Sequence, residues 1–188
     1  PGQLNRPSGL AIDRSGNVVV VDHLNFRVQT YTPDGELVRC WGRRGDGPGA
    51  FDLPWGVDIG PDGAIYVADW NNNRVQKLAP DGEFLMSFGQ PGGGPGCLHR
   101  PSSVAVAADG IVYVADRGND RVQVFAADGS HLATLHGELI DRLRGAVEAW
   151  PVPPSLVGLF GSAARRDGDA GSDIDVLIVS DDPELPDR

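Results

Sequence analysis

The sequence is short of several residue types, and each shortage narrows the interpretation. Only two cysteines occur in 188 residues, Cys40 and Cys97. Their positions make no metal-binding spacing, so we expect two free thiols, which leave the redox compartment open. No apolar run approaches the length of a membrane-spanning helix. No charged-then-apolar leader is visible either, although a start at Pro-Gly rather than Met leaves the native N-terminus open. We therefore expect no membrane partner.

Basic side chains are also scarce. The chain has 16 Lys and Arg against 26 Asp and Glu, a formal net charge of −10. Residues 138–188 alone hold 5 basic and 11 acidic side chains, so the short C-terminal part is the more acidic one. Because a sequence-independent grip on nucleic acid needs a basic surface, this balance argues against a nucleic acid partner.

Glycine and proline, by contrast, are abundant at 26 and 15 residues, which favours turns and short strands over long helices. A period of 47 residues runs through the first part of the chain. It relates the residues of the following sets: Pro7, Pro54, Pro101; Asp22, Asp69, Asp116; Asn25, Asn72, Asn119; Arg27, Arg74, Arg121; Gln29, Gln76, Gln123. A constant period across three copies indicates a repeat architecture.

Each copy is expected to form four short strands bounded by turn residues. In the first copy these strands are expected at 9–12, 18–21, 27–31 and 36–41. Four strands of this length match one blade of a β-propeller, so the fold class is mainly β. Three blades alone would leave open edges, and we expect either further blades or an oligomer that covers the open blade edges.

The motif Asp-x-x-Asn-x-Arg-Val-Gln recurs at 22–29, 69–76 and 116–123, and Pro-Ser-Gly-Leu-Ala-Ile-Asp stands at 7–13. Together they resemble the NHL repeat family, over about residues 4–136. The resemblance implies a β-propeller used mostly for binding. We expect residues 1–136 to form this region, with blades over about 4–50, 51–97 and 98–136. The repeated Asp, Asn and Arg are interpreted as structural, because every blade shares them; Asp22 is expected to cap its turn.

Binding specificity should instead lie where the copies differ. His23, Trp70 and Arg117 occupy the same position after the shared aspartate, and Trp55 replaces the serines of the other copies. These positions fall on expected loops or strand ends, where binding residues concentrate. Trp and Arg are also favoured contact residues. We expect these four to contact a protein or a small ligand; the alternative is that the tryptophans simply pack against a strand.

The pattern changes after residue 137. Apolar residues at 139, 140, 143, 146, 147 and 150 have helical spacing, and the prolines that follow end the helix. Strands are expected at 156–160 and 174–179, separated by a Gly-Ser turn and an Asp/Gly-rich loop. We therefore expect a second domain over 138–188, a small α/β unit with the order helix, strand, turn, strand.

Two aspartates in this unit have a spacing that suits metal binding. Asp173 and Asp175 are two residues apart at an expected strand, so their carboxylates point to the same face. Two carboxylates together with substrate phosphates are a common way to hold Mg²⁺.

The run Gly161-Ser162-Ala-Ala-Arg165, followed by Ser-Asp173-Ile-Asp175, is similar to the minimal nucleotidyltransferases of the polymerase-beta superfamily, which include antitoxin-type and kanamycin nucleotidyltransferase-like proteins. The resemblance implies an NTP substrate, with Gly161, Ser162 and Arg165 at its phosphates. It implies that Asp173 and Asp175 are catalytic and bind Mg²⁺. A cytoplasmic location and a toxin-type partner for this part would follow from it.

The same family has a third carboxylate on a later strand, beyond Arg188. We therefore expect a binding or scaffold module fused to a nucleotidyltransferase-like domain that is inactive or incomplete in this chain. Two functional alternatives stay open: an active nucleotidyltransferase targeted by its propeller, and a protein-interaction propeller fragment with a non-functional tail. It also stays open whether the reading frame joins pieces of two genes.

Overall fold

The computed structural model describes residues 2–136, 157–161 and 174–179. The described chain is mainly β, as expected. It contains three four-stranded antiparallel sheets and one two-stranded sheet. Each four-stranded sheet is built from strands that follow one another in the chain, which is the arrangement of a propeller blade.

The blades begin at the repeated prolines. Blade 1 contains β1 (Pro7–Ile12), β2 (Val18–Asp22), β3 (Arg27–Tyr31) and β4 (Leu37–Trp41). Blade 2 contains β5 (Pro54–Ile59), β6 (Ile65–Asp69), β7 (Arg74–Leu78) and β8 (Phe84–Phe88). Blade 3 contains β9 (Pro101–Val106), β10 (Val112–Asp116), β11 (Arg121–Phe125) and β12 (His131–His136). The expected four strands per copy are confirmed, with the first strand starting at the proline itself, a position where proline is tolerated.

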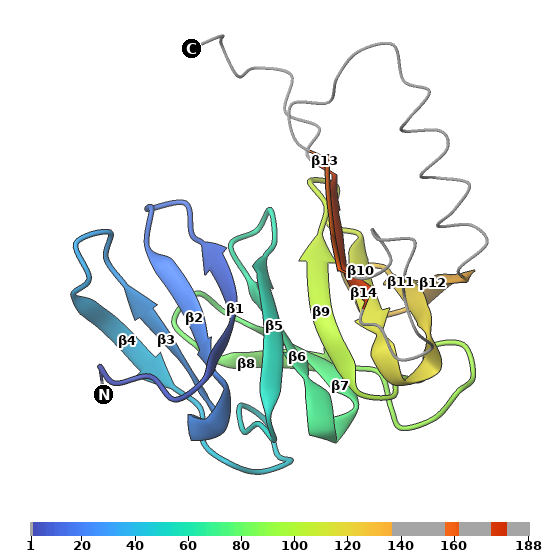
Figure 1. Ribbon diagram of the computed structural model, residues 1–188, viewed down its shortest axis with the longest axis horizontal. Helices are drawn as coiled ribbons and strands as arrows, with labels where there is room; N and C mark the ends of the chain where they lie inside the picture. Colours follow the sequence, from blue (N-terminus) through green and yellow to red (C-terminus); the bar gives the residue numbers. More distant parts are fainter. Residues whose placement is uncertain (1, 137–156, 162–173, 180–188) are drawn as a thin grey trace, which may run out of the picture.

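A short 3-10 turn follows the second strand of each blade: η1 (His23–Asn25), η2 (Trp70–Asn72) and η3 (Arg117–Asn119). Each turn ends in a residue with left-handed backbone, namely Phe26, Asn73 and Asp120. This single left-handed residue reverses the chain into the third strand. The 3-10 turns and the starts of β1, β5 and β9 therefore lie at the same end of the blades, the lower end in Figure 1.

The three blades stand side by side as an open fan, with the first strands β1, β5 and β9 next to one another (Figure 1). Glycine makes this close approach feasible. A Cβ atom at Gly56 would lie 2.6 Å from the Cα atom of Ser103 in the next blade, and one at Gly9 would lie 2.6 Å from the carbonyl oxygen of Trp55. The inner strands therefore pack backbone against backbone.

The apolar core consists of two layers, one between each pair of neighbouring blades. Between blades 1 and 2 it is formed by Val19, Val21, Val28, Phe51, Val57, Ile65, Val67 and Leu78. Between blades 2 and 3 it is formed by Ala64, Tyr66, Val75, Phe88, Leu98, Val104, Val112, Val114 and Phe125. The burial of these side chains is the main source of stability in this part of the chain.

The described part of the C-terminal region is a two-stranded antiparallel sheet of β13 (Val157–Gly161) and β14 (Ile174–Val179). Both strands were expected, the first one residue earlier. Strand β14 lies beside β9 and β10 of blade 3 (Figure 1). The expected helix over 138–150 lies outside the described residues. In the described ranges, no helix has the length and apolar character that crossing a bilayer requires.

Candidate functional site

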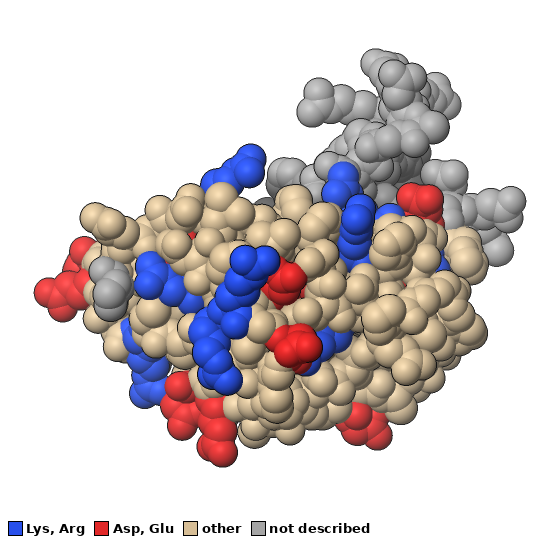
Figure 2. All heavy atoms as spheres, turned by 90° about the horizontal axis from the view of Figure 1, so that it is seen from below, with Lys and Arg blue, Asp and Glu red and all other residues tan. Residues whose placement is uncertain are grey.

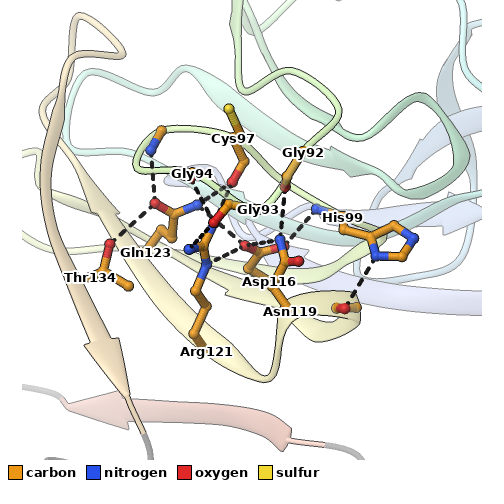
Figure 3. A network of polar contacts seen from close by, with 12 residues as sticks. Gly92, Gly93, Gly94, Cys97, His99, Asp116, Asn119, Arg121, Gln123 and Thr134 are labelled. Atoms are coloured by element: carbon orange, nitrogen blue, oxygen red, sulfur yellow. Dashed lines mark hydrogen bonds and ion pairs between the residues drawn. The ribbon is translucent and has the colours of Figure 1, made fainter.

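The repeated polar residues form one network per blade, shown for blade 3 in Figure 3. The Oδ2 atom of Asp116 accepts hydrogen bonds from Asn119 Nδ2 at 2.9 Å, Arg121 Nε at 2.7 Å and Gln123 Nε2 at 3.2 Å. Its Oδ1 atom accepts the backbone N–H of His99 at 2.6 Å. The carboxylate is fully buried and has several donors around it. This is how a buried charge is accommodated.

The arginine and glutamine of the network reach the connection that arrives from the preceding blade. Arg121 donates to the carbonyl oxygens of Gly93, Gly94 and Cys97 at 2.8 to 2.9 Å. Gln123 Oε1 accepts the N–H of Gly96 at 2.9 Å. Each network thus ties its blade to the incoming loop, and blades 1 and 2 repeat the arrangement around Asp22 and Asp69. These contacts support the structural interpretation of the repeated residues.

One detail of that interpretation was wrong. Asp22 does not cap its own turn, because no side-chain hydrogen bond is made to the N–H groups of η1. Its Oδ1 atom instead accepts the N–H of Asn5, 17 residues earlier, at 2.6 Å. The equivalent carboxylates of Asp69 and Asp116 do the same with Asp52 and His99. The aspartate therefore fixes the start of the blade through its Oδ1 atom, while its Oδ2 atom accepts a hydrogen bond from the Asn25 side chain of η1.

The surroundings of two equivalent aspartates act on their pKa in opposite directions. Burial acts to raise the pKa of Asp22, but hydrogen bonds from Asn5, Asn25 and Arg27 outweigh it and hold that pKa below the usual value. For Asp69, burial dominates over the same kinds of hydrogen bond and raises the pKa. The difference agrees with the packing, since blade 2 has a neighbour on both sides within the described chain and blade 1 has one.

Three of the positions that differ between the copies, His23, Trp55 and Trp70, lie together at the end of the blades that carries the 3-10 turns. The rings of His23 and Trp55 lie 5.2 Å apart, and those of Trp55 and Trp70 lie 5.6 Å apart. The guanidinium of Arg100 sits 5.0 Å from the centre of the Trp70 ring, which is cation–π geometry. We call these four residues the aromatic row. It crosses from blade 1 over blade 2 to the start of blade 3.

The aromatic row is partly exposed to solvent, and His23 is fixed by a hydrogen bond to the backbone. Trp55 is 37% exposed, Arg100 is exposed, and His23 and Trp70 are half-buried. His23 Nδ1 lies 2.9 Å from the carbonyl oxygen of Pro54, so this nitrogen carries the proton and donates. Figure 2 views the molecule from this end, where basic side chains group near the middle with acidic side chains beside them.

The structure therefore brings together three of the four expected ligand-surface residues, His23, Trp55 and Trp70. Arg117 lies in η3, at the position that corresponds to His23 in η1 and Trp70 in η2. Sequence reasoning missed Arg100. It directly precedes the repeated proline of blade 3, so its place next to a 3-10 turn of blade 2 follows only from how the blades pack.

The residues expected to bind a nucleotide lie mostly outside the described residues: Ser162, Arg165 and Asp173. Gly161 ends β13, and Asp175 is the second residue of β14. The strand register pairs Gly161 with Ile174, so the backbone between the two aspartates lies opposite the start of the Gly-Ser turn. Within the described ranges, no group of three or more His, Cys, Asp or Glu side chains is arranged to hold a metal ion.

Comparison with known proteins finds two family models that match this chain. Residues 4–31, 51–78 and 98–125 each match the family model of the NHL repeat, and residues 140–187 match that of the nucleotidyltransferase domain. A curated relative is protein wech of Drosophila melanogaster, 53% identical over 36 residues, which are 19% of this chain and 4% of that protein.

Similar solved structures include a streptogramin B lyase, with a TM-score of 0.55 and 16% identity over 69% of this chain and 40% of that chain. A catalytically inactive virginiamycin B lyase from Staphylococcus aureus has a TM-score of 0.56 and 19% identity over 70% and 41%. Hydrazine synthase of Kuenenia stuttgartiensis has a TM-score of 0.56 and 16% identity over 70% and 36%. At these identities the likeness concerns the fold alone, and this chain spans less than half of each of these chains.

The fold and the repeated networks define a protein of the β-propeller class, built from consecutive four-stranded blades. More particularly, its three blades are NHL repeats, and a nucleotidyltransferase-domain match follows them in the same chain.

Proposed function

We propose that this chain is an NHL-repeat binding module that recognises a partner through the aromatic row, joined to a nucleotidyltransferase-type domain. The observation that carries the first part is the contiguity of His23, Trp55, Trp70 and Arg100 at one end of the blades. Residues that differ between otherwise regular repeats, and that nevertheless form one surface, are suited to specific recognition rather than to a structural task shared by all blades.

The chemistry of the row indicates the kind of partner. Tryptophan faces bind apolar groups, and a guanidinium stacked on one of them pairs with a carboxylate. A protein segment that presents an apolar or aromatic side chain next to an acidic one fits both features. A small ligand with a flat apolar part and an acidic group has the same chemistry, and the net charge of the chain argues against nucleic acid.

Selection of peptides from a random 12-residue library tests this function. Wild-type protein is expected to enrich acidic peptides with an aromatic or large aliphatic residue. Trp55→Ala and Arg100→Ala are each expected to weaken their binding by about tenfold or more, as for central contact residues. The matched control is Leu85→Ala, which changes another exposed apolar residue on the outer strand β8. Equal binding by all variants, or equal loss in the control, would count against the aromatic row.

For the second part we infer that the C-terminal domain binds an NTP and is of the type that transfers an NMP group. In this proposal Asp173 and Asp175 hold Mg²⁺, while Gly161, Ser162 and Arg165 contact the nucleotide. Bound Mg²⁺ would position the phosphates and stabilise the charge that develops during transfer. The match of residues 140–187 to the nucleotidyltransferase domain supports it, as does the register that sets Gly161 opposite Ile174.

Calorimetry with ATP tests this second part separately from transfer. Binding that needs Mg²⁺ is expected for the wild type, with loss in Asp175→Asn and no change in the control Asp181→Asn. Transfer from labelled ATP is measured on the same variants. Robust transfer that Asp173→Asn abolishes would favour the active enzyme, and no ATP binding at all would leave the propeller as the functional part.

A further inference from the structure

The end of the blades that carries the aromatic row has a second arginine stacked on a ring. The guanidinium carbon of Arg44 lies 5.1 Å from the centre of the Phe26 ring, as that of Arg100 lies 5.0 Å from the centre of the Trp70 ring. Phe26 directly follows η1, and Arg44 lies in the connection between blades 1 and 2. We call Arg44 and Phe26 the second stack. It lies outside the four residues of the aromatic row.

The second stack is not a feature of the repeat. The residues 47 positions after Phe26 and Arg44 are Asn73 and Pro91, which cannot form such a pair. A structural task shared by all blades therefore does not account for it. The same reasoning assigned recognition to the aromatic row.

A chain of polar contacts joins the second stack to the aromatic row. Arg44 Nε lies 4.0 Å from Asp52 Oδ1, and Asp52 Oδ2 accepts a hydrogen bond of 2.6 Å from Asn71 Nδ2. Asn71 is next to Trp70 in η2, and Trp70 carries Arg100 from the start of blade 3. The two guanidiniums therefore flank η2, one on the side of blade 1 and one on the side of blade 3.

Both guanidiniums are accessible to a partner. The side chain of Arg44 is 73% exposed, and Arg100 is exposed as well. Stacking occupies the face of a guanidinium and leaves the N–H groups in its plane free to donate. Asp52 is at the distance limit of an ion pair with Arg44, and among the described residues no carboxylate is paired with Arg100.

The backbone that carries each arginine is fixed. The N–H and the carbonyl oxygen of Phe51 bond to the residues on either side of Arg44, at 2.8 and 3.0 Å. The N–H of Arg100 donates to Asn73 Oδ1 at 2.9 Å. Because a group that is already held loses less conformational freedom on binding, these two arginines are suited to specific recognition.

We propose that the partner is a protein segment with two acidic side chains, one on each side of the apolar side chain that Trp55 and Trp70 bind. One acidic side chain pairs with Arg100 and the other with Arg44. The inference rests on the proposed function of the aromatic row and adds the second stack to it.

The charges at this end of the blades favour a protein segment over nucleic acid. Asp52 places a carboxylate between Arg44 and η2, and further acidic side chains lie beside the basic ones (Figure 2). A continuous phosphate backbone would meet these carboxylates. A segment with an apolar side chain between its two acidic ones places negative charge only at the arginines.

Fluorescence anisotropy with a set of labelled peptides tests the proposal. Each peptide has one tryptophan with a glutamate on either side, and each spacer holds up to about three alanines, which covers adjacent and extended spacings. At least one peptide of the set is expected to bind. Replacing either of its glutamates by glutamine should weaken binding by about tenfold, the scale of one charge-assisted hydrogen-bonded pair.

Variants of the protein locate the second acidic side chain. Arg44→Gln should weaken binding of the two-glutamate peptide by about tenfold, and this loss should not add to that of the one peptide change that removes its partner. Phe26→Asn removes the ring but uses the residue found at the equivalent left-handed position, Asn73, and should weaken binding several-fold. The matched control is Arg43→Gln, since Arg43 is exposed and, in the part of the chain that the structure describes, stacks on no ring. Circular dichroism checks that each variant folds.

Equal weakening by Arg44→Gln and Arg43→Gln would show an effect of overall charge and would overturn the proposal. Failure of every peptide in the set to bind would overturn it as well, and so would tighter binding of a short oligothymidylate that Arg44→Gln abolishes. Loss of binding in Trp55→Ala with no effect of Arg44→Gln would keep the aromatic row as the site and reject only the two-acid partner. Binding that Trp55→Ala leaves unchanged would contradict the proposed function itself and this inference with it.

Discussion

The structural interpretation of the repeated aspartates is tested most directly at Asp69, in the blade that has neighbours on both sides. Its carboxylate is fully buried, and its Oδ2 atom accepts hydrogen bonds from Asn72, Arg74 and Gln76. Its Oδ1 atom accepts the N–H of Asp52 at 2.8 Å. Replacing Asp69 by alanine would leave four donors without this acceptor, among them the guanidinium of Arg74, whose side chain is only 15% exposed.

Removing one partner of a buried ion pair generally costs about 3–5 kcal/mol, because the remaining charge stays buried. We expect Asp69→Ala to lower the free energy of unfolding by about this amount, which is a large part of the stability of a typical domain. The double variant Asp69→Ala/Arg74→Ala should recover part of the loss, since it removes the unpaired charge as well. The difference between the double variant and the sum of the single ones measures the coupling.

Urea unfolding followed by tryptophan fluorescence is the appropriate assay, with Asp81→Ala as the control. Asp81 lies in an exposed Asp-Gly turn, where its carboxylate accepts a hydrogen bond from Glu83. Its removal should change stability by about 0.5 kcal/mol or less, as for most surface substitutions. A loss below about 1 kcal/mol for Asp69→Ala, similar to the control, would refute the reasoning. Unchanged stability with lost partner binding would instead make the repeated aspartates part of a ligand site.

Two further predictions concern the contact between blades 2 and 3. Gly56→Ala should lower the free energy of unfolding by about 1–3 kcal/mol in urea unfolding, because its Cβ would lie 2.6 Å from the Cα of Ser103. The control is Gly47→Ala, since a Cβ there would have nothing within 4 Å. Equal effects of the two substitutions would contradict this packing. Burial raises the pKa of Asp58 above 3.8 despite hydrogen bonds from Val106 and Ile59. The folded chain then holds this proton more tightly than the unfolded chain, so stability relative to Asp58→Asn should fall as pH rises from 3.8 through the raised pKa and level off above it. Urea unfolding of both proteins between pH 3 and 7 checks this. A wild-type stability that rises relative to Asp58→Asn with increasing pH would contradict it.

The blades were predictable because the same pattern of strand and turn residues occurs three times in the sequence. Pro7, Pro54 and Pro101 mark the strand starts, and the β-branched runs between turn residues mark the strands. One copy alone would have given an ambiguous pattern. Three copies in a constant period leave little choice of architecture.

The details that escaped prediction depend on contacts between segments that no local rule connects. The carboxylate of Asp22 reaches the backbone of Asn5 because the incoming connection passes over the start of the blade. Arg100 stacks on Trp70 for the same kind of reason. Leu10 and Val57 have the same role in the repeat, yet their exposure differs ninefold or so, because burial is decided by the presence of a neighbouring blade.

For the nucleotidyltransferase part, the sequence motif remains the main source of information. The pairing of Gly161 with Ile174 agrees with the expected order of strand, turn and strand. The proposed roles of Ser162, Arg165 and Asp173 lie outside the described residues and stay predictions. They follow from residue type and spacing, which is why the ATP-binding experiment above carries their test.

The bond pattern of Arg121 and Gln123 also bears on how such chains change in length. Each polar network joins one sheet to the connection just upstream of it. A repeat unit that contains its whole network therefore starts in a connection and not at a strand. Because the sequence repeats every 47 residues, the duplication or loss of 47 residues keeps the repeat in register. Such a change adds or removes one sheet together with its complete polar network.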